Sequence, residues 1–239
     1  MTRIPSKNFI VGLGVLGVAL IVCTLIARNA VLKARAFGST ITVTGSAIKP
    51  IRSDMAIWEG NLTASAATLD LAYAKMKKDL GQLESFLAEQ EFVQTDFAIG
   101  PVQINRNYNR EGQPTGYNLY QSVTLRLADV DRIATLAQQA STLIEKGVEL
   151  TSLQPRYMYT KLEDVKIEMI KAATENAKLR ANQLAQTTGS DIGAPVSARI
   201  GVFQIRPQYS QEVSDYGIND MSSIDKEIVS TVSVAFRIE

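Results

Sequence analysis

The chain opens on a long apolar segment. Residues 9–27 carry no charged side chain and are apolar or small almost throughout, and Arg28, Lys33 and Arg35 follow directly. A helix of this length rises about 30 Å, which matches the hydrocarbon core of a bilayer. The pattern predicts a short basic tail at 1–8, a transmembrane anchor at 9–27 and a juxtamembrane linker at 28–39.

A cleaved signal peptide is the alternative for this segment. Ala34-Arg35-Ala36 matches the small-x-small pattern of a cleavage site, and Arg3 and Lys7 form a basic start. The apolar core of a signal peptide is usually about 7–15 residues long, and here three cations separate it from Ala36. We favour the uncleaved anchor. Cations flank the segment on both sides, so charge alone does not fix its orientation.

Residues 40–239 alternate between strand-like and helix-like patterns. Period-two alternation of apolar and polar residues predicts strands at 40–46, 55–63, 95–108, 116–127, 149–159, 195–205 and 226–238. Pro50 is expected to end the first strand because proline cannot donate to a ladder, so the first two strands should form a hairpin. The polar stretch 206–223 is expected to be a mobile loop.

Apolar residues spaced three and four apart predict helices at 68–90, 129–147 and 162–188. Thr68 and Asp129 suit the N-cap position, and Gly147 and Gly189 suit helix ends. Hairpins that flank helices, rather than strict strand–helix alternation, are typical of an α+β fold. We therefore predict one domain at 40–239, with a mostly antiparallel sheet packed against about three helices.

The composition excludes several kinds of chemistry. The chain has no histidine, and its single cysteine, Cys23, lies in the apolar segment. It therefore lacks Ser-His and Cys-His nucleophilic pairs and histidine metal ligands. Five of its Lys and Arg residues precede residue 37. The rest of the chain therefore has a small excess of acidic side chains, which does not suit a surface that binds nucleic acid. We predict no enzymatic activity, no metal and no cofactor.

Two short patterns resemble catalytic motifs but have plainer explanations. Ser46 and Lys49 have the S-x-x-K spacing of penicillin-recognising enzymes. Residues three apart on a strand point to opposite faces, so the geometry fails. Asp129 and Asp131 could form an acid pair, but their place before an apolar helix suits capping better.

The tyrosines are the strongest candidates for a binding surface. Tyr108, Tyr117 and Tyr120 should lie on one hairpin, and Tyr157 and Tyr159 on one face of a later strand. Tyrosine offers contact area with a polar tip, which suits an oligomer interface or a groove for a ligand. Partly buried sheet aromatics are the equally weighted alternative.

A set of motifs occurs in order from residue 41 to 238: Ile41-Thr-Val-Thr-Gly45, Ser53-Asp54-Met55-Ala56, Gly116-Tyr117, Ser122–Leu127, Asp129-Val-Asp131, Ala173, Ala177, Ala181, Ala185 and Ser230–Ile238. The alanines recur every fourth residue of the long helix, which would let a sheet or a partner helix pack closely against it. In this order the motifs resemble the SIMPL-domain family, whose bacterial members include periplasmic immunogenic proteins. The segment Asn105–Tyr108 departs from the family pattern of a proline and paired aromatics.

The resemblance implies an extracytoplasmic bacterial protein without established catalytic residues, some relatives of which are similar to ring-like homo-oligomers. We therefore expect an inner-membrane protein with its C-terminal domain in the periplasm or outside, or a soluble periplasmic protein if it is cleaved. Its expected role is self-assembly, in envelope or oxidative-stress tolerance. The alternative is a module that binds a small apolar or peptide ligand at the tyrosine-bearing sheet.

Overall fold

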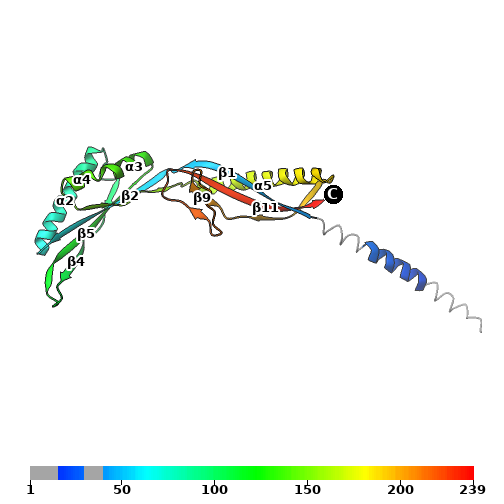
Figure 1. Cartoon of the computed structure of the whole chain (residues 1–239), viewed down its shortest axis with the longest axis horizontal. Helices are drawn as coiled ribbons and strands as arrows, with labels where there is room; N and C mark the ends of the chain where they lie inside the picture. The colour runs from blue at the N-terminus through cyan, green and yellow to red at the C-terminus, as the bar shows by residue number, and fades with distance from the viewer. Residues whose placement is uncertain (1–15, 30–39) are drawn as a thin grey trace, which may run out of the picture. The chain divides into compact units, whose positions relative to one another are not determined.

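The computed structural model describes residues 16–29 and 40–239. Residues 40–239 combine helices with two mostly antiparallel sheets, so the predicted α+β class is confirmed (Figure 1). They divide into two compact units. The first includes residues 170–201 and 231–239 with the start of the first strand, and the second includes residues 48–169 and 202–230.

The second unit contains a six-stranded sheet. Its central strands are β2 (Met55–Ala66) and β5 (Pro114–Leu127), which pair antiparallel from Ala56 opposite Leu127 to Ala66 opposite Tyr117. Two short strands continue the sheet on each side: β3 (Phe97–Ile99) and β4 (Gln103–Tyr108) beside β5, and β6 (Leu150–Ser152) and β7 (Arg156–Met158) beside β2.

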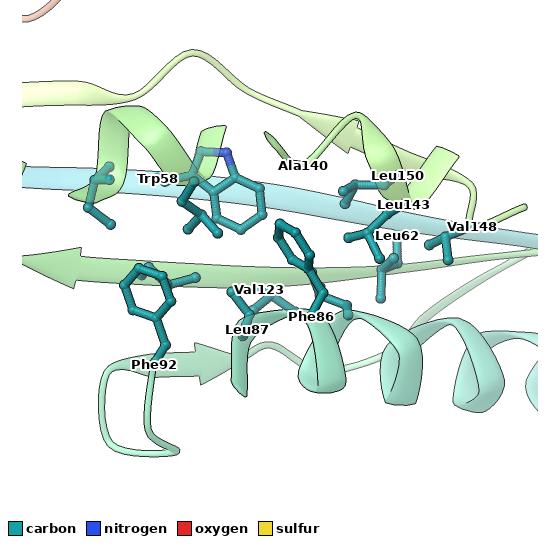
Figure 2. Packing of buried hydrophobic residues seen from close by; sticks show 14 of the residues in the cluster. Trp58, Leu62, Phe86, Leu87, Phe92, Val123, Ala140, Leu143, Val148 and Leu150 are labelled. Carbon is teal, nitrogen blue, oxygen red and sulfur yellow. The ribbon is translucent and has the colours of Figure 1, made fainter. Parts of the chain in front are cut away.

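Three helices contribute apolar side chains to a core on one face of this sheet: α2 (Leu69–Glu89), α3 (Val130–Gln139) and α4 (Thr142–Glu145). Figure 2 shows Phe86 of α2 pointing toward the strands, where Leu62 and Leu143 join it in the core. Trp58 is fully buried, and its indole nitrogen donates to Ser152 Oγ at 2.9 Å. This hydrogen bond satisfies the buried indole N–H, which would cost stability if it had no partner.

The other sheet has five strands in the order β1-β11-β9-β10, with β8 also paired to β11. β8 and β9 each pair antiparallel with β11, whereas the short β10 pairs parallel with β9. Its strands are β1 (Thr40–Arg52), β8 (Ile192–Ile200), β9 (Gln204–Pro207), β10 (Ile218–Asn219) and β11 (Asp225–Ile238).

The helix α5 (Leu162–Thr187) packs through its alanines in the first unit. Ala173, Ala177 and Ala181 are fully buried against Val43 of β1 and apolar residues of β11. The predicted alanine stripe is therefore confirmed as a packing surface. The approach is so close that a Cβ on Gly45 would clash with backbone atoms of Ala173 and Ala177.

The predicted opening hairpin is wrong. β1 and β2 are joined by Ser53 and Asp54, but β1 pairs with β11, whereas β2 pairs with β5, β6 and β7. Pro50 also does not end β1, which continues to Arg52. β1 lies at an edge of its sheet, where the missing N–H of proline costs no ladder hydrogen bond.

Four predicted elements are interrupted. The strand at 95–108 is split at Gly100-Pro101, that at 149–159 near Pro155, and that at 195–205 near Gly201. The helix at 129–147 is likewise two helices, α3 and α4. Proline removes a ladder donor and glycine packs poorly, so both residues favour such breaks.

Residues 16–29 form a helix. In the described part of the chain, no helix is long and apolar enough to cross a membrane. Residues 9–15 of the predicted anchor, the tail at 1–8 and residues 30–39 of the predicted linker lie outside the described residues.

Candidate functional site

The predicted tyrosine hairpin is confirmed as a pair of strands. Tyr108 lies at the end of β4, and Tyr117 and Tyr120 lie on β5, which pairs with β4. Tyr157 lies in β7, and Tyr159 follows that strand by one position. All five residues belong to the second unit.

These tyrosines do not share one face. Tyr117 packs against the helix-covered core, with the Arg106 guanidinium 5.3 Å from the centre of its ring. Tyr157 is buried in the same core. Tyr120 is three residues from Tyr117 on one strand, so it points to the opposite face, and Tyr108 is largely exposed.

Burial raises the pKa of Tyr157, and the nearby Asp131 carboxylate raises it further. Both causes disfavour the phenolate, and the ring itself packs in the apolar core. The side chain of Tyr157 is therefore a core aromatic rather than an accessible binding group. Tyr159 is half-buried.

The face of the six-stranded sheet that bears Tyr120 is polar. Along β2, Glu59, Asn61 and Thr63 alternate with buried residues and point to this outer face. The register places Ser122 of β5 on one side of Asn61 and Thr151 of β6 on the other. Directly opposite residues of paired strands point to the same side, so these side chains form a cross-strand row.

A second row lies next to the first. Thr63 is opposite Tyr120, and Tyr120 is opposite Gln103 of β4. A hollow of about 390 Å³ lies over both rows. Its volume is within the range of small-molecule sites, about 300–1,000 Å³. The side chains around it include Glu59, Asn61, Thr63, Gln103, Tyr120 and Thr151.

Sequence reasoning identified Tyr120 but missed the polar residues around it. The alternation of Glu59, Asn61 and Thr63 with apolar neighbours was the available signal for β2. The positions of Gln103 and Thr151 depend on strand register, which no local pattern in the sequence reveals.

Buried charges lie elsewhere in the second unit. Lys226 is 1% exposed, and its Nζ donates to the carbonyl of Tyr157 at 2.7 Å and to the carbonyl of Asp220. The Asp220 carboxylate lies 4.0 Å away and accepts hydrogen bonds from Ser222. Burial lowers the pKa of Lys226, and the attraction of Asp220 opposes that change.

A second buried ion pair helps to fix the position of the segment that follows β9. Arg206 binds the Glu227 carboxylate at 2.7 Å and donates to the carbonyl of Glu212 at 3.0 Å. Gln204 exchanges hydrogen bonds with the backbone of Ser214. Arg206, which was predicted to begin a loop, is thus a buried residue of β9.

The other candidate chemistry has structural explanations. Lys49 forms an ion pair with Glu168 at 2.5 Å. Asp129 caps α3 by accepting from the Arg132 backbone N–H, as predicted, while Asp131 binds Arg52 through both carboxylate oxygens at 2.7 Å. Within residues 16–29 and 40–239, no group of His, Cys, Asp and Glu could hold a metal ion.

The fold and its surfaces thus define an α+β domain with a helix-covered sheet and an open polar face. Residues 41–236 match the model of the SIMPL family, described as a protein of unknown function (DUF541). The chain belongs to the SIMPL family. The resemblance noted in the sequence is therefore confirmed.

No curated protein matches the chain. Among solved structures, the chain is similar to a hydantoinase/carbamoylase family amidase from Burkholderia ambifaria, with 16% sequence identity and a TM-score of 0.27. The alignment covers 46% of this chain and 29% of the amidase. A similarity this low supports no statement about fold or activity.

Proposed function

We propose that this chain is a non-enzymatic, membrane-anchored protein that self-assembles into a homo-oligomer outside the cytoplasm, with a role in envelope or oxidative-stress tolerance. The observation that carries the proposal is an exposed strand at a sheet edge. All six residues of β4 are exposed, and β4 pairs with β5 alone among the described strands. The other side of β4 therefore offers unpaired backbone donors and acceptors to a further strand.

A second exposed edge supports the same proposal. In the first unit, residues 197–200 of β8 are exposed, and β8 pairs with β11 alone among the described strands. Ala198 and Ile200 lie opposite Val234 and Val232 of β11. The edge thus combines free backbone groups with apolar side chains, which is the pattern expected of a pairing surface.

The anchor supports assembly by concentrating the chains. The helix at residues 16–29 exposes Leu16, Ile21 and Ile26, each by more than 60%. Such a surface suits contact with lipid rather than water. Confinement to a membrane raises the effective concentration of neighbouring copies, so weak edge contacts would be sufficient for assembly.

The test replaces one apolar residue at each edge by lysine. We expect Ile104→Lys in β4 or Ile200→Lys in β8 to lower the mass of the assembly in mild detergent, because a charge at a sheet edge blocks strand pairing. Both side chains are more than half exposed, so the fold of each chain should be retained. Light scattering measures the mass.

Leu179→Lys is the matched control. Leu179 is an exposed apolar residue of the helix α5, 66% exposed, and has no place at a sheet edge. Its variant should keep the mass of the unmodified protein. If both edge variants also keep that mass, the edges are not the interface.

A module that binds a ligand at the tyrosine-bearing sheet is the second candidate function. The hollow beside Tyr120 favours it. A ligand-dependent rise in the unfolding temperature that is lost in Tyr120→Ala would support this function. No such rise with small apolar ligands, sugars or peptides would contradict it.

A further inference from the structure

The hollow on the outer face of the six-stranded sheet has side chains that are free to bind. The side chains of Asn61, Thr63, Gln103 and Thr151 make no hydrogen bond to any residue that the structure describes. The amide of Gln121, at the rim, is by contrast engaged with the carbonyl of Gly100 at 2.9 Å. The first four therefore present amide and hydroxyl groups to whatever occupies the hollow.

The backbone N–H and C=O groups beneath the hollow are already engaged in pairing between strands of the sheet. β2 pairs with β5 on one side and with β6 and β7 on the other, and β5 pairs with β2 on one side and with β3 and β4 on the other. An extended peptide that lies over these central strands therefore finds no free backbone groups there, and strand addition is restricted to sheet edges. Recognition in the hollow depends on side chains.

The charges of the lining narrow the ligand class further. Glu59 is the charged residue among the described residues that line the hollow, and none of them is a cation. An anionic ligand such as a phosphate would meet a carboxylate without a compensating charge. The predominance of amides and hydroxyls equally disfavours an apolar ligand, because filling the hollow would leave those groups unpaired.

Tyr120 supplies the apolar contact. It is 37% exposed and stands between Thr63 and Gln103 in the second cross-strand row. Its ring offers a flat surface with a polar tip. Amides and hydroxyls on both sides of that ring can each donate and accept, which matches a ligand that carries several hydroxyl groups.

We infer that this hollow binds a neutral or amino-bearing saccharide of one or two rings. A sugar ring stacks on Tyr120, and its hydroxyls bond to Asn61, Thr63, Gln103 and Thr151. This inference rests on the second candidate function, the binding module, and is independent of self-assembly.

The test is saturation-transfer NMR on the full chain in mild detergent, with cellobiose, maltose, lactose and diacetylchitobiose as probes. We expect transfer to at least one of these disaccharides. Tyr120→Ala and Asn61→Leu should each weaken binding about tenfold or more, because they remove the stacking surface and a central amide. Tyr73→Ala is the matched control, since Tyr73 is an exposed tyrosine of α2 outside the hollow.

Unfolding temperatures of all variants, measured alongside, show whether a loss of binding reflects a loss of fold. The absence of transfer to all four sugars, or binding that Tyr120→Ala leaves intact, would overturn the inference. Stabilisation by a mixed hexapeptide pool that Tyr120→Ala abolishes, without any sugar binding, would overturn the saccharide class but retain the binding module. Stabilisation by neither would reject both.

Discussion

At the scale of single residues, Lys226 shows how a buried charge can hold several segments together. Its ammonium binds the carbonyl of Tyr157, which lies in β7, and the carbonyl of Asp220, which directly follows β10. It also lies near the Asp220 carboxylate. The side chains of Lys226 and Asp220 are 1% and 8% exposed. Removal of one member of such a pair leaves the other without compensation.

We therefore predict that Lys226→Met lowers the free energy of unfolding by about 3–5 kcal/mol. Lys49→Met is the control, because the Lys49–Glu168 pair is substantially exposed and should contribute less than about 1 kcal/mol. Urea unfolding of both variants measures the difference. Equal losses would contradict the role assigned to the buried pair.

Asp79 gives a prediction for pH. It is 3% exposed on the inner side of α2, and its Oδ2 has no hydrogen-bond partner in the described chain. Burial raises the pKa of Asp79, and the charge of the Glu149 carboxylate adds to the rise. Lys75, Lys78 and a hydrogen bond from the Glu149 backbone oppose it. The folded state thus holds the proton more tightly than the unfolded state does.

The stability that Asp79 contributes is therefore present at low pH. It is lost as pH rises from the ordinary pKa of aspartate through the raised pKa of Asp79 in the folded protein. Asp79→Asn removes this titration. We expect the free energy of unfolding of the unmodified protein, minus that of the variant, to increase as pH falls through that window. Urea unfolding over a pH series measures it, and a constant difference would refute the assignment.

At the scale of elements, the packing of α5 on β1 depends on small residues from both. Gly45 of β1 meets the backbone of α5 where Ala173 and Ala177 are fully buried. Gly45→Ala should lower the free energy of unfolding by about 1–3 kcal/mol, because the added methyl forces the helix away from the strand.

Gly81→Ala is the matched control for Gly45→Ala. Gly81 lies in α2, and a Cβ there would meet nothing within 4 Å. Alanine favours a helix over glycine by about 1 kcal/mol, so this variant should be more stable. Thermal unfolding measures both. A neutral Gly45→Ala would mean that α5 and β1 are not in close contact.

The same elements show what local patterns can predict. The alanine stripe of α5 and the cap at Asp129 depend on residues within one helix, and both were found as expected. The pairing of β1 with β11 joins segments far apart in the chain, and period-two alternation contains no information about such partners. The effect of Pro50 depended on that pairing as well, since only an edge strand tolerates it.

At the scale of the whole molecule, the candidate site also depends on strand pairings that local sequence patterns do not reveal. Tyr120 and the alternation along β2 were visible in the sequence. The hollow, however, required β4 and β6 to bring Gln103 and Thr151 beside those strands. Of the candidate tyrosines, Tyr157 is buried in the core and Tyr117 is partly buried against it, whereas Tyr120 lies beside the hollow on the open face.

The proposed self-assembly is a property of many copies, and its components are distributed along the chain. The apolar segment would hold copies in one membrane, and the exposed edges β4 and β8 would join them. Because each copy carries both edges, contacts between unlike edges could close into a ring, and contacts between like edges would give pairs.

The mass of the full-length protein, extracted in mild detergent, tests the central claim most directly. Light scattering gives the size of the assembly, and intact mass spectrometry on the same sample shows whether residues 9–27 are retained. The account predicts a multimer of uncleaved chains. A monomer that begins near Phe37 would contradict both the anchor and the assembly.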